Sequence, residues 1–133
     1  SNLIKFNLYF LKKMEKERKK SQSEENSRVS IEELQLIEQS LQNLLMQKQM
    51  FQMELVETTN ALEELKKMKA KEEVFKIVGT IMIKSEKEDI EKELSRKKEL
   101  ITMRINAIEK QEDGLKNKLI EKREEVLKTF KNH

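Results

Sequence analysis

The sequence predicts a mostly α-helical protein, in which a long antiparallel two-helix coiled coil is joined by one short β-hairpin. Charged residues make up 40% of the chain and aromatic residues only 5%, too few apolar side chains for a compact globular core. Two series of apolar residues with three- and four-residue spacing cover residues 34–65 and 94–126, which favours paired helices. Between them, residues 73–85 read Glu-Val-Phe-Lys-Ile-Val-Gly-Thr-Ile-Met-Ile-Lys-Ser, the one short stretch of β-type sequence.

Residues 1–29 form an N-terminal extension that is expected to be partly disordered. Residues 1–13 hold half of the aromatic side chains, and residues 14–29 are rich in Lys, Glu, Ser, Asn and Gln. The positive charges follow the apolar block and no small-residue cleavage pattern comes after it, which argues against a signal peptide. A native extension and sequence upstream of the natural start both fit a chain that begins with Ser1.

Residues 30–71 are expected to form the first coiled-coil helix. Ser30 and Glu33 have the spacing of a capping box, which predicts that the helix begins there. A lysine-rich turn, residues 66–71, ends the arm as the helix macrodipole favours. The seam of this arm comprises Leu34, Ile37, Leu41, Leu44, Lys48, Phe51, Leu55, Thr58, Leu62 and Leu65.

Residues 72–85 are expected to form a β-hairpin, with strands Val74–Val78 and Thr80–Lys84 around Gly79. Two strands alone are marginal in water, because their apolar side chains have no sheet to pack on. An exposed apolar strand pair then serves as an assembly device, with other copies supplying the rest of the sheet. The predicted assembly interface comprises Val74, Phe75, Ile77, Val78, Gly79, Ile81, Met82 and Ile83.

Residues 86–131 are expected to form the second coiled-coil helix, opened by a capping box of Ser85 and Glu88. The spacing continues in frame through Gly114, which predicts a helix weakened there by about 1 kcal/mol. The short connection forces the arms to lie antiparallel, with both chain termini at the end far from the hairpin. Folding about Gly79 places Lys48 near Glu112 and Thr58 opposite Lys98. The seam of this arm comprises Leu94, Lys98, Ile101, Ile105, Ile108, Glu112, Leu115, Leu119, Lys122 and Val126.

The layout and several motifs resemble a β-type subunit of the prefoldin family. The resemblance covers roughly residues 31–128. It rests on Ala-Leu-Glu-Glu-Leu (61–65) ahead of the strands, on the hairpin motif itself, and on Arg-Ile-Asn-Ala-Ile (104–108) with Gln111-Glu112 in the second arm. Heptad similarity alone is unspecific, whereas a strand motif flanked by two arms of matched length is specific. The apolar start of residues 1–29 departs from the family pattern.

The resemblance implies a cytoplasmic chaperone that needs no cofactor. The resemblance also implies a hexamer, in which two α-type and four β-type subunits join their hairpins into an intersubunit β-barrel. The coiled coils hold unfolded client proteins between their tips and pass them to a group II chaperonin without nucleotide. A single hairpin argues for the β type, since α-type subunits carry two.

Client binding would use apolar residues near the tips. Leu36, Ile120, Leu127 and Phe130 lie outside the seam, and the seam members Leu34, Ile37 and Val126 join them if the end frays. An alternative is that these residues only thicken the local core. Met46, Met50 and Met53 recur at helical spacing off the seam. Their soft thioethers suit promiscuous binding. The alternative is that they are helix-forming surface residues without a function.

The sequence offers no catalyst and no metal site. The only histidine is His133, expected to be a frayed end, and there is no cysteine, phosphate loop or catalytic triad. Residues 1–20 carry seven Lys or Arg against two Glu, but the rest is charge-mixed, so neither nucleic acid nor a membrane is expected as a partner. Two alternatives remain: a structural coiled-coil spacer without chaperone activity, and a membrane or nucleic-acid binder acting through residues 1–20.

Overall fold

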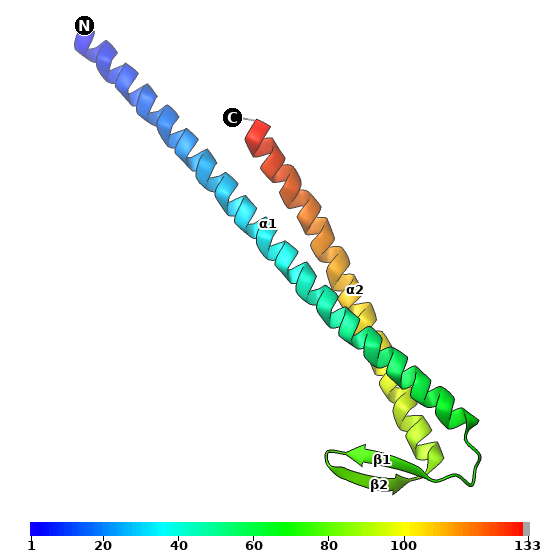
Figure 1. The fold of residues 1–133 in the computed structure, drawn as a ribbon. Helices are drawn as coiled ribbons and strands as arrows, with labels where there is room; N and C mark the ends of the chain where they lie inside the picture. The colour runs from blue at the N-terminus through cyan, green and yellow to red at the C-terminus, as the bar shows by residue number, and fades with distance from the viewer. Residues whose placement is uncertain (132–133) are drawn as a thin grey trace. The chain divides into compact units, whose positions relative to one another are not determined.

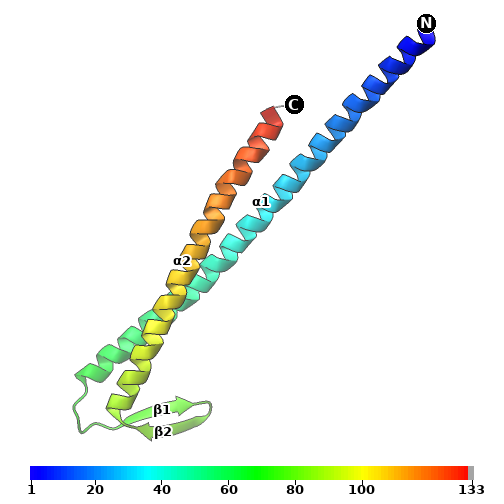
Figure 2. The same cartoon turned by 180° about the vertical axis from the view of Figure 1, so that it is seen from behind.

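A computed structural model describes residues 1–131, so His133 lies outside the described residues. The order of elements is helix α1 (Asn2–Lys67), strand β1 (Val74–Val78), strand β2 (Ile81–Ser85) and helix α2 (Lys87–Lys131). The mostly helical fold class with one hairpin is confirmed. Figure 1 shows the hairpin beside the residues where α1 ends and α2 begins, and the view from behind in Figure 2 shows the same arrangement.

The chain divides into two compact units, one formed by Gln42–Asp113 and one by Ser1–Leu41 with the segment from Gly114 onward. In the first unit, α1 and α2 are antiparallel, since Lys48 contacts Glu112 and Lys87 contacts Met68. In the second unit, Glu33 pairs with Lys122 at 2.6 Å and Glu38 with Arg123 at 3.6 Å. Both helix pairs therefore follow the predicted antiparallel register.

The predicted seam is the buried face of both helices, with one exception. In the first unit, the buried apolar side chains are Leu62, Leu65, Ile101, Ile105 and Ile108, and Thr58 and Glu112 are buried among them. Lys98 is exposed, so the expected polar layer of Thr58 with Lys98 does not form as two buried partners. A lysine at a seam position can carry its ammonium group out to water on a flexible stem, which explains this difference.

The predicted helix start at Ser30 is wrong, because α1 runs without a break from Asn2. Residues 1–29 contain no Gly or Pro, and pairs such as Glu15 with Lys19 at 3.4 Å and Glu25 with Arg28 at 2.9 Å support the helix. Ser27 is buried and donates its hydroxyl to the carbonyl of Ser23 at 3.0 Å. The seam therefore continues upstream through small serine residues, which an apolar pattern search does not detect.

The second capping box does not form as predicted. Ser85 is the last residue of β2, and its hydroxyl donates to the carbonyl of Ile83 at 3.5 Å. The first helical hydrogen bonds of α2 instead run from the amides of Asp89 and Ile90 to the carbonyl of Glu86. Pairing of Val74 with Ser85 keeps Ser85 in the strand, so Glu86 takes the N-cap position.

The first arm ends four residues earlier than the predicted residue 71. Lys66 and Lys67 occupy the last turn of α1, and the ammonium group of Lys87 donates to the carbonyl of Met68 at 2.9 Å. Carbonyl groups at a helix C-terminus carry negative partial charge, so these cations stabilise the end.

Candidate functional site: the hairpin and the distal apolar residues

The hairpin is closed by a two-residue turn at Gly79 and Thr80. Gly79 has φ of 60° and is the one residue with positive φ in the described chain, which matches a type II′ turn with glycine first. Val78 therefore pairs with Ile81 rather than with Thr80, and the second strand begins one residue later than the sequence predicted. This turn sets the register of the whole strand pair.

Both faces of the hairpin carry apolar side chains. Residues directly opposite one another share a face, and successive residues alternate. One face carries Phe75, Ile77, Met82 and Lys84, and the other carries Val74, Lys76, Val78, Ile81, Ile83 and Ser85. Ile77, Ile81 and Met82 remain 69%, 62% and 64% exposed. The strand pair is therefore apolar on both sides and mostly exposed, although Val74 and Lys76 on the second face are half-buried. Its use as an assembly interface stays a prediction.

Each strand also has an open edge, because the sheet formed by the described residues has two strands. Val78 and Ile81 flank the turn as a hydrogen-bonded pair, so hydrogen-bonded and non-bonded pairs alternate from there. The amides and carbonyls of Phe75 and Ile77 on β1, and of Met82 and Lys84 on β2, consequently point away from the ladder. These groups can pair with a strand of another chain.

Two ion pairs position the hairpin. The ammonium group of Lys76 lies 2.6 Å from the carboxylate of Glu93 on α2, which ties β1 to the second helix. Lys84 lies 3.4 Å from Glu73, just before β1. The side chains of these pairs are largely exposed, so each pair adds little to stability, and only the pair of Lys76 with Glu93 links the hairpin to a helix.

The predicted client-binding residues fall into two groups in the unit that holds both chain ends. Leu34, Ile37 and Val126 are half-buried in the seam. Leu36, Ile120, Leu127 and Phe130 are all more than half exposed, so no part of the described chain covers them. Ile120, Leu127 and Phe130 recur at i, i+7 and i+10, which places them on one flank of α2.

Val29 is not among the predicted client-binding residues, yet it is exposed and lies seven residues before Leu36 on α1. The helical spacing to Leu36 could have shown this residue, but the segment before Ser30 was not expected to be helical. Upstream of it, the side chains of residues 1–22 are all exposed.

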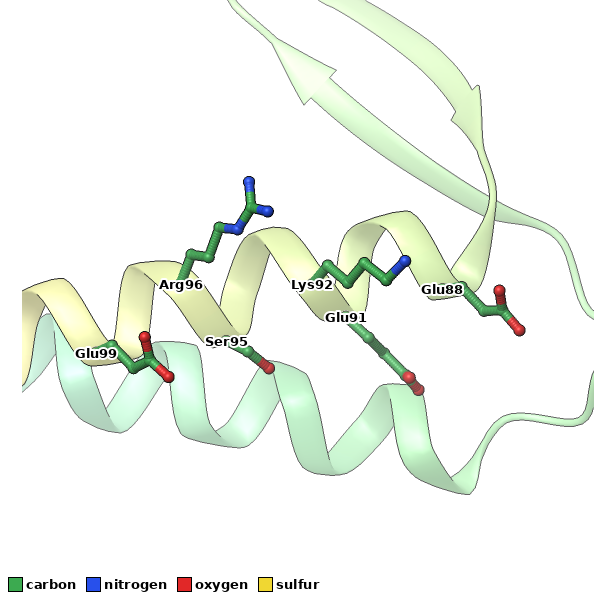
Figure 3. Close-up of a pocket in the computed structure, with 6 residues that line it drawn as sticks. All are labelled: Glu88, Glu91, Lys92, Ser95, Arg96 and Glu99. Atoms are coloured by element: carbon green, nitrogen blue, oxygen red, sulfur yellow. The ribbon is translucent and has the colours of Figure 1, made fainter.

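Among residues 1–131, no group of three or more His, Cys, Asp or Glu side chains could hold a metal ion. A shallow surface groove is lined by six residues that all come from α2, and Figure 3 shows charges of both signs along the helix. These residues are Glu88, Glu91, Lys92, Ser95, Arg96 and Glu99. Mixed charges at such spacing are typical of a solvated helix face.

Within the described residues, neither helix contains a stretch that is apolar and long enough to cross a lipid bilayer.

Comparison with known proteins gives one consistent result. A family model described as prefoldin subunit matches residues 28–133. The chain is 36% identical over 96 residues to prefoldin subunit beta of Archaeoglobus fulgidus, covering 72% of this chain and 83% of that protein. It is 40% identical over 89 residues to prefoldin subunit beta of Thermococcus onnurineus, covering 67% and 77%. The crystal structure of the prefoldin beta subunit from Thermococcus strain KS-1 superposes with a TM-score of 0.72 at 35% identity, covering 76% of this chain and 89% of that one.

Proposed function

Because the chain belongs to the prefoldin family, among its β-type subunits, and therefore has a prefoldin-type chaperone role, we propose that it assembles with α-type subunits through its hairpin and holds unfolded proteins at the distal ends of its helices. The proposed assembly is a hexamer of two α-type and four β-type subunits. The assembly would then pass the unfolded client protein to a group II chaperonin, without using a nucleotide.

One observation carries the proposal: the hairpin exposes apolar side chains on both faces and polar backbone groups along both edges. Two strands cannot bury such a surface by themselves. A partner strand would satisfy the edge amides and carbonyls, while neighbouring hairpins would cover the faces. A structural spacer needs only a turn between its helices and would gain nothing from this surface.

The distal residues support the client-binding half of the proposal. Leu36, Ile120, Leu127 and Phe130 expose apolar surface on helices that are rich in charge elsewhere. Exposed apolar side chains on a charged scaffold can bind apolar segments of an unfolded chain while the scaffold stays dispersed.

The test has two parts. Size-exclusion chromatography with light scattering, with and without an α-type prefoldin subunit, should give the mass of a hexamer for the mixture. That hexamer should then suppress the aggregation of citrate synthase diluted from guanidinium chloride, in the absence of ATP. A mixture that stays as separate subunits would contradict the assembly proposal, and unchanged aggregation would contradict the holding function.

A further inference from the structure

The outward face of α1 carries a row of exposed methionines within the unit Gln42–Asp113. Met46, Met50 and Met53 each follow a seam residue by two positions, which turns them by about 200° from the seam at 3.6 residues per turn. They are 63%, 68% and 65% exposed, and Val56 continues the row at 59%. A shallow groove lined partly by Met53 and Val56 runs along this surface. We call Met46, Met50, Met53 and Val56 the methionine face.

Charge is sparse around Met46 and Met50, whereas Glu54 and Glu57 flank Val56 at the other end of the methionine face, and Glu57 lines the groove together with Met53 and Val56. Residues 39–53 contain a single charged side chain, Lys48, in a chain in which 40% of residues are charged. Its ammonium group lies in the seam, 2.7 Å from the carboxylate of Glu112, and so does not face outward with the methionines. The other polar residues of the segment are Gln39, Ser40, Gln42, Asn43, Gln47, Gln49 and Gln52.

We propose that the methionine face is a second binding surface for unfolded polypeptides, specific for apolar segments without charge. Unbranched methionine side chains adapt their shape to different apolar partners. The surrounding amides can donate to and accept from the unpaired backbone of an extended chain. Around Met46 and Met50, binding desolvates no ionised side chain of residues 39–53, which would otherwise oppose the contact. The inference rests on the proposed holding function and adds a surface that is separate from the distal residues.

The extent of the surface argues against a second copy of the chain as its occupant. The methionine face spans residues 46–56, about 15 Å along the helix at 1.5 Å per residue. A coiled coil needs three to four heptads, and a stable protein interface buries on the order of 800 Å² on each partner. Less than two heptads on one helix face provides neither. Weak and repeated contact with a non-native chain needs much less surface.

The test compares two variants of the full chain in its native assembly. The first is Met46→Gln, Met50→Gln, Met53→Gln, which keeps good helix formers. The matched control is Leu100→Gln, Met103→Gln on α2, where exposed apolar residues stand among charged ones. The probe is fluorescein-labelled, reduced and carboxymethylated α-lactalbumin, which stays unfolded in solution, and binding is measured by fluorescence anisotropy at low and high salt.

We expect the triple variant to bind the probe about tenfold more weakly at either salt concentration, as the loss of part of three apolar contacts implies. The control variant should bind like the unmodified chain. A photo-crosslinking residue in place of Met50 should also capture the probe, and one in place of Met103 should not.

The outcomes separate this inference from the proposed function. If the unmodified assembly binds the probe and the triple variant binds it equally well, the inference is overturned and the proposed function stands. If the unmodified assembly does not bind the probe, the holding function fails, and the inference fails with it. A change in assembly mass for the triple variant would identify the face as a contact between copies, which also overturns the inference.

Discussion

Lys48 and Glu112 form a polar layer inside an otherwise apolar seam. Their side chains are only 20% and 8% exposed, and the ammonium group lies 2.7 Å from the carboxylate. The hydrogen bond to Glu112 raises the pKa of Lys48 above its ordinary value, against the opposing effect of desolvation. Close by, the Arg104 guanidinium lies 5.5 Å from the ring centre of Phe51, a cation–π contact between the helices. Such a layer disfavours slipped registers, because a slip would bury a charge against leucine or isoleucine.

Replacing both partners tests what this layer does. We expect Lys48→Leu, Glu112→Leu to raise the melting temperature, since two well-packed apolar residues replace two desolvated charges. The register should become less uniform, which inter-helix cross-linking between engineered cysteines would detect. Lys48→Leu alone should lower the melting temperature, because Glu112 keeps a buried carboxylate without its cation. An unchanged melting temperature and an unchanged register in the double variant would indicate that the pair specifies nothing.

The same pair predicts a dependence of stability on alkaline pH. The pKa of Lys48 is raised in the folded chain above 10.5, so its contribution to stability is complete below that pH. The contribution is lost as the pH rises through the higher folded pKa. The melting temperature of the unmodified chain should therefore fall more steeply above pH 10.5 than that of the double leucine variant. Parallel curves for the two proteins would argue against the linkage.

At the scale of single elements, the two glycines have opposite roles. Gly114 lies within α2, and an added Cβ there would meet no atom within 4 Å. Gly79 has φ of 60° in the hairpin turn, a conformation that residues with a Cβ adopt only at a cost. Gly114 therefore weakens a helix, whereas Gly79 is required by the turn.

Alanine substitutions make this contrast measurable. Gly114→Ala should raise the free energy of unfolding by about 0.5–1 kcal/mol, through higher helix propensity. Gly79→Ala should lower it by about 1 kcal/mol, through strain in the left-handed region. Thermal denaturation followed by circular dichroism compares the two. A shift in the same direction for both variants would contradict the assigned conformations.

The hairpin predicts a separation between folding and assembly. Ile77 is 69% exposed, so Ile77→Asp should leave the helix content of the chain largely intact. It should prevent hexamer formation, because an unpaired carboxylate would be buried between subunits. Met103→Asp, at an equally exposed site on α2, is the matched control and should still assemble. Light scattering gives the mass of each assembly. A monodisperse hexamer for Ile77→Asp would show that the hairpin is not needed for assembly.

At the scale of the whole molecule, residues 2–22 are helical, and no side chain of residues 1–22 is buried against the rest of the described chain. Their deletion should change the free energy of unfolding by less than about 1 kcal/mol, as for other exposed segments. Assembly and client holding should also survive, which distinguishes a chaperone from a binder that acts through residues 1–20. Loss of all binding activity in the deletion variant would favour the second alternative.

A larger truncation tests the predicted client-binding residues. Removing residues 1–36 together with residues 122–133 takes away most of the predicted client-binding side chains, while the unit Gln42–Asp113 keeps its hairpin and buried seam. The truncated chain should still assemble but should lose most of its ability to suppress aggregation. Protection as strong as that of the complete chain would move the main binding surface to the methionine face.

The sequence alone determined the two-helix layout, the seam positions and the antiparallel register, because each depends on periodic side-chain burial along a regular helix. The pairing of Lys48 with Glu112 was predicted in this way and is confirmed. Helix ends and the exact strand bounds were decided by tertiary structure. Ser30 and Ser85 have the right spacing for capping boxes, yet one lies inside α1 and the other ends β2, because helix continuation and strand pairing satisfy their backbone groups instead. Tertiary structure also decided which seam side chains are exposed. Lys98 occupies a seam position but remains in water, since its flexible stem lets the charge avoid burial.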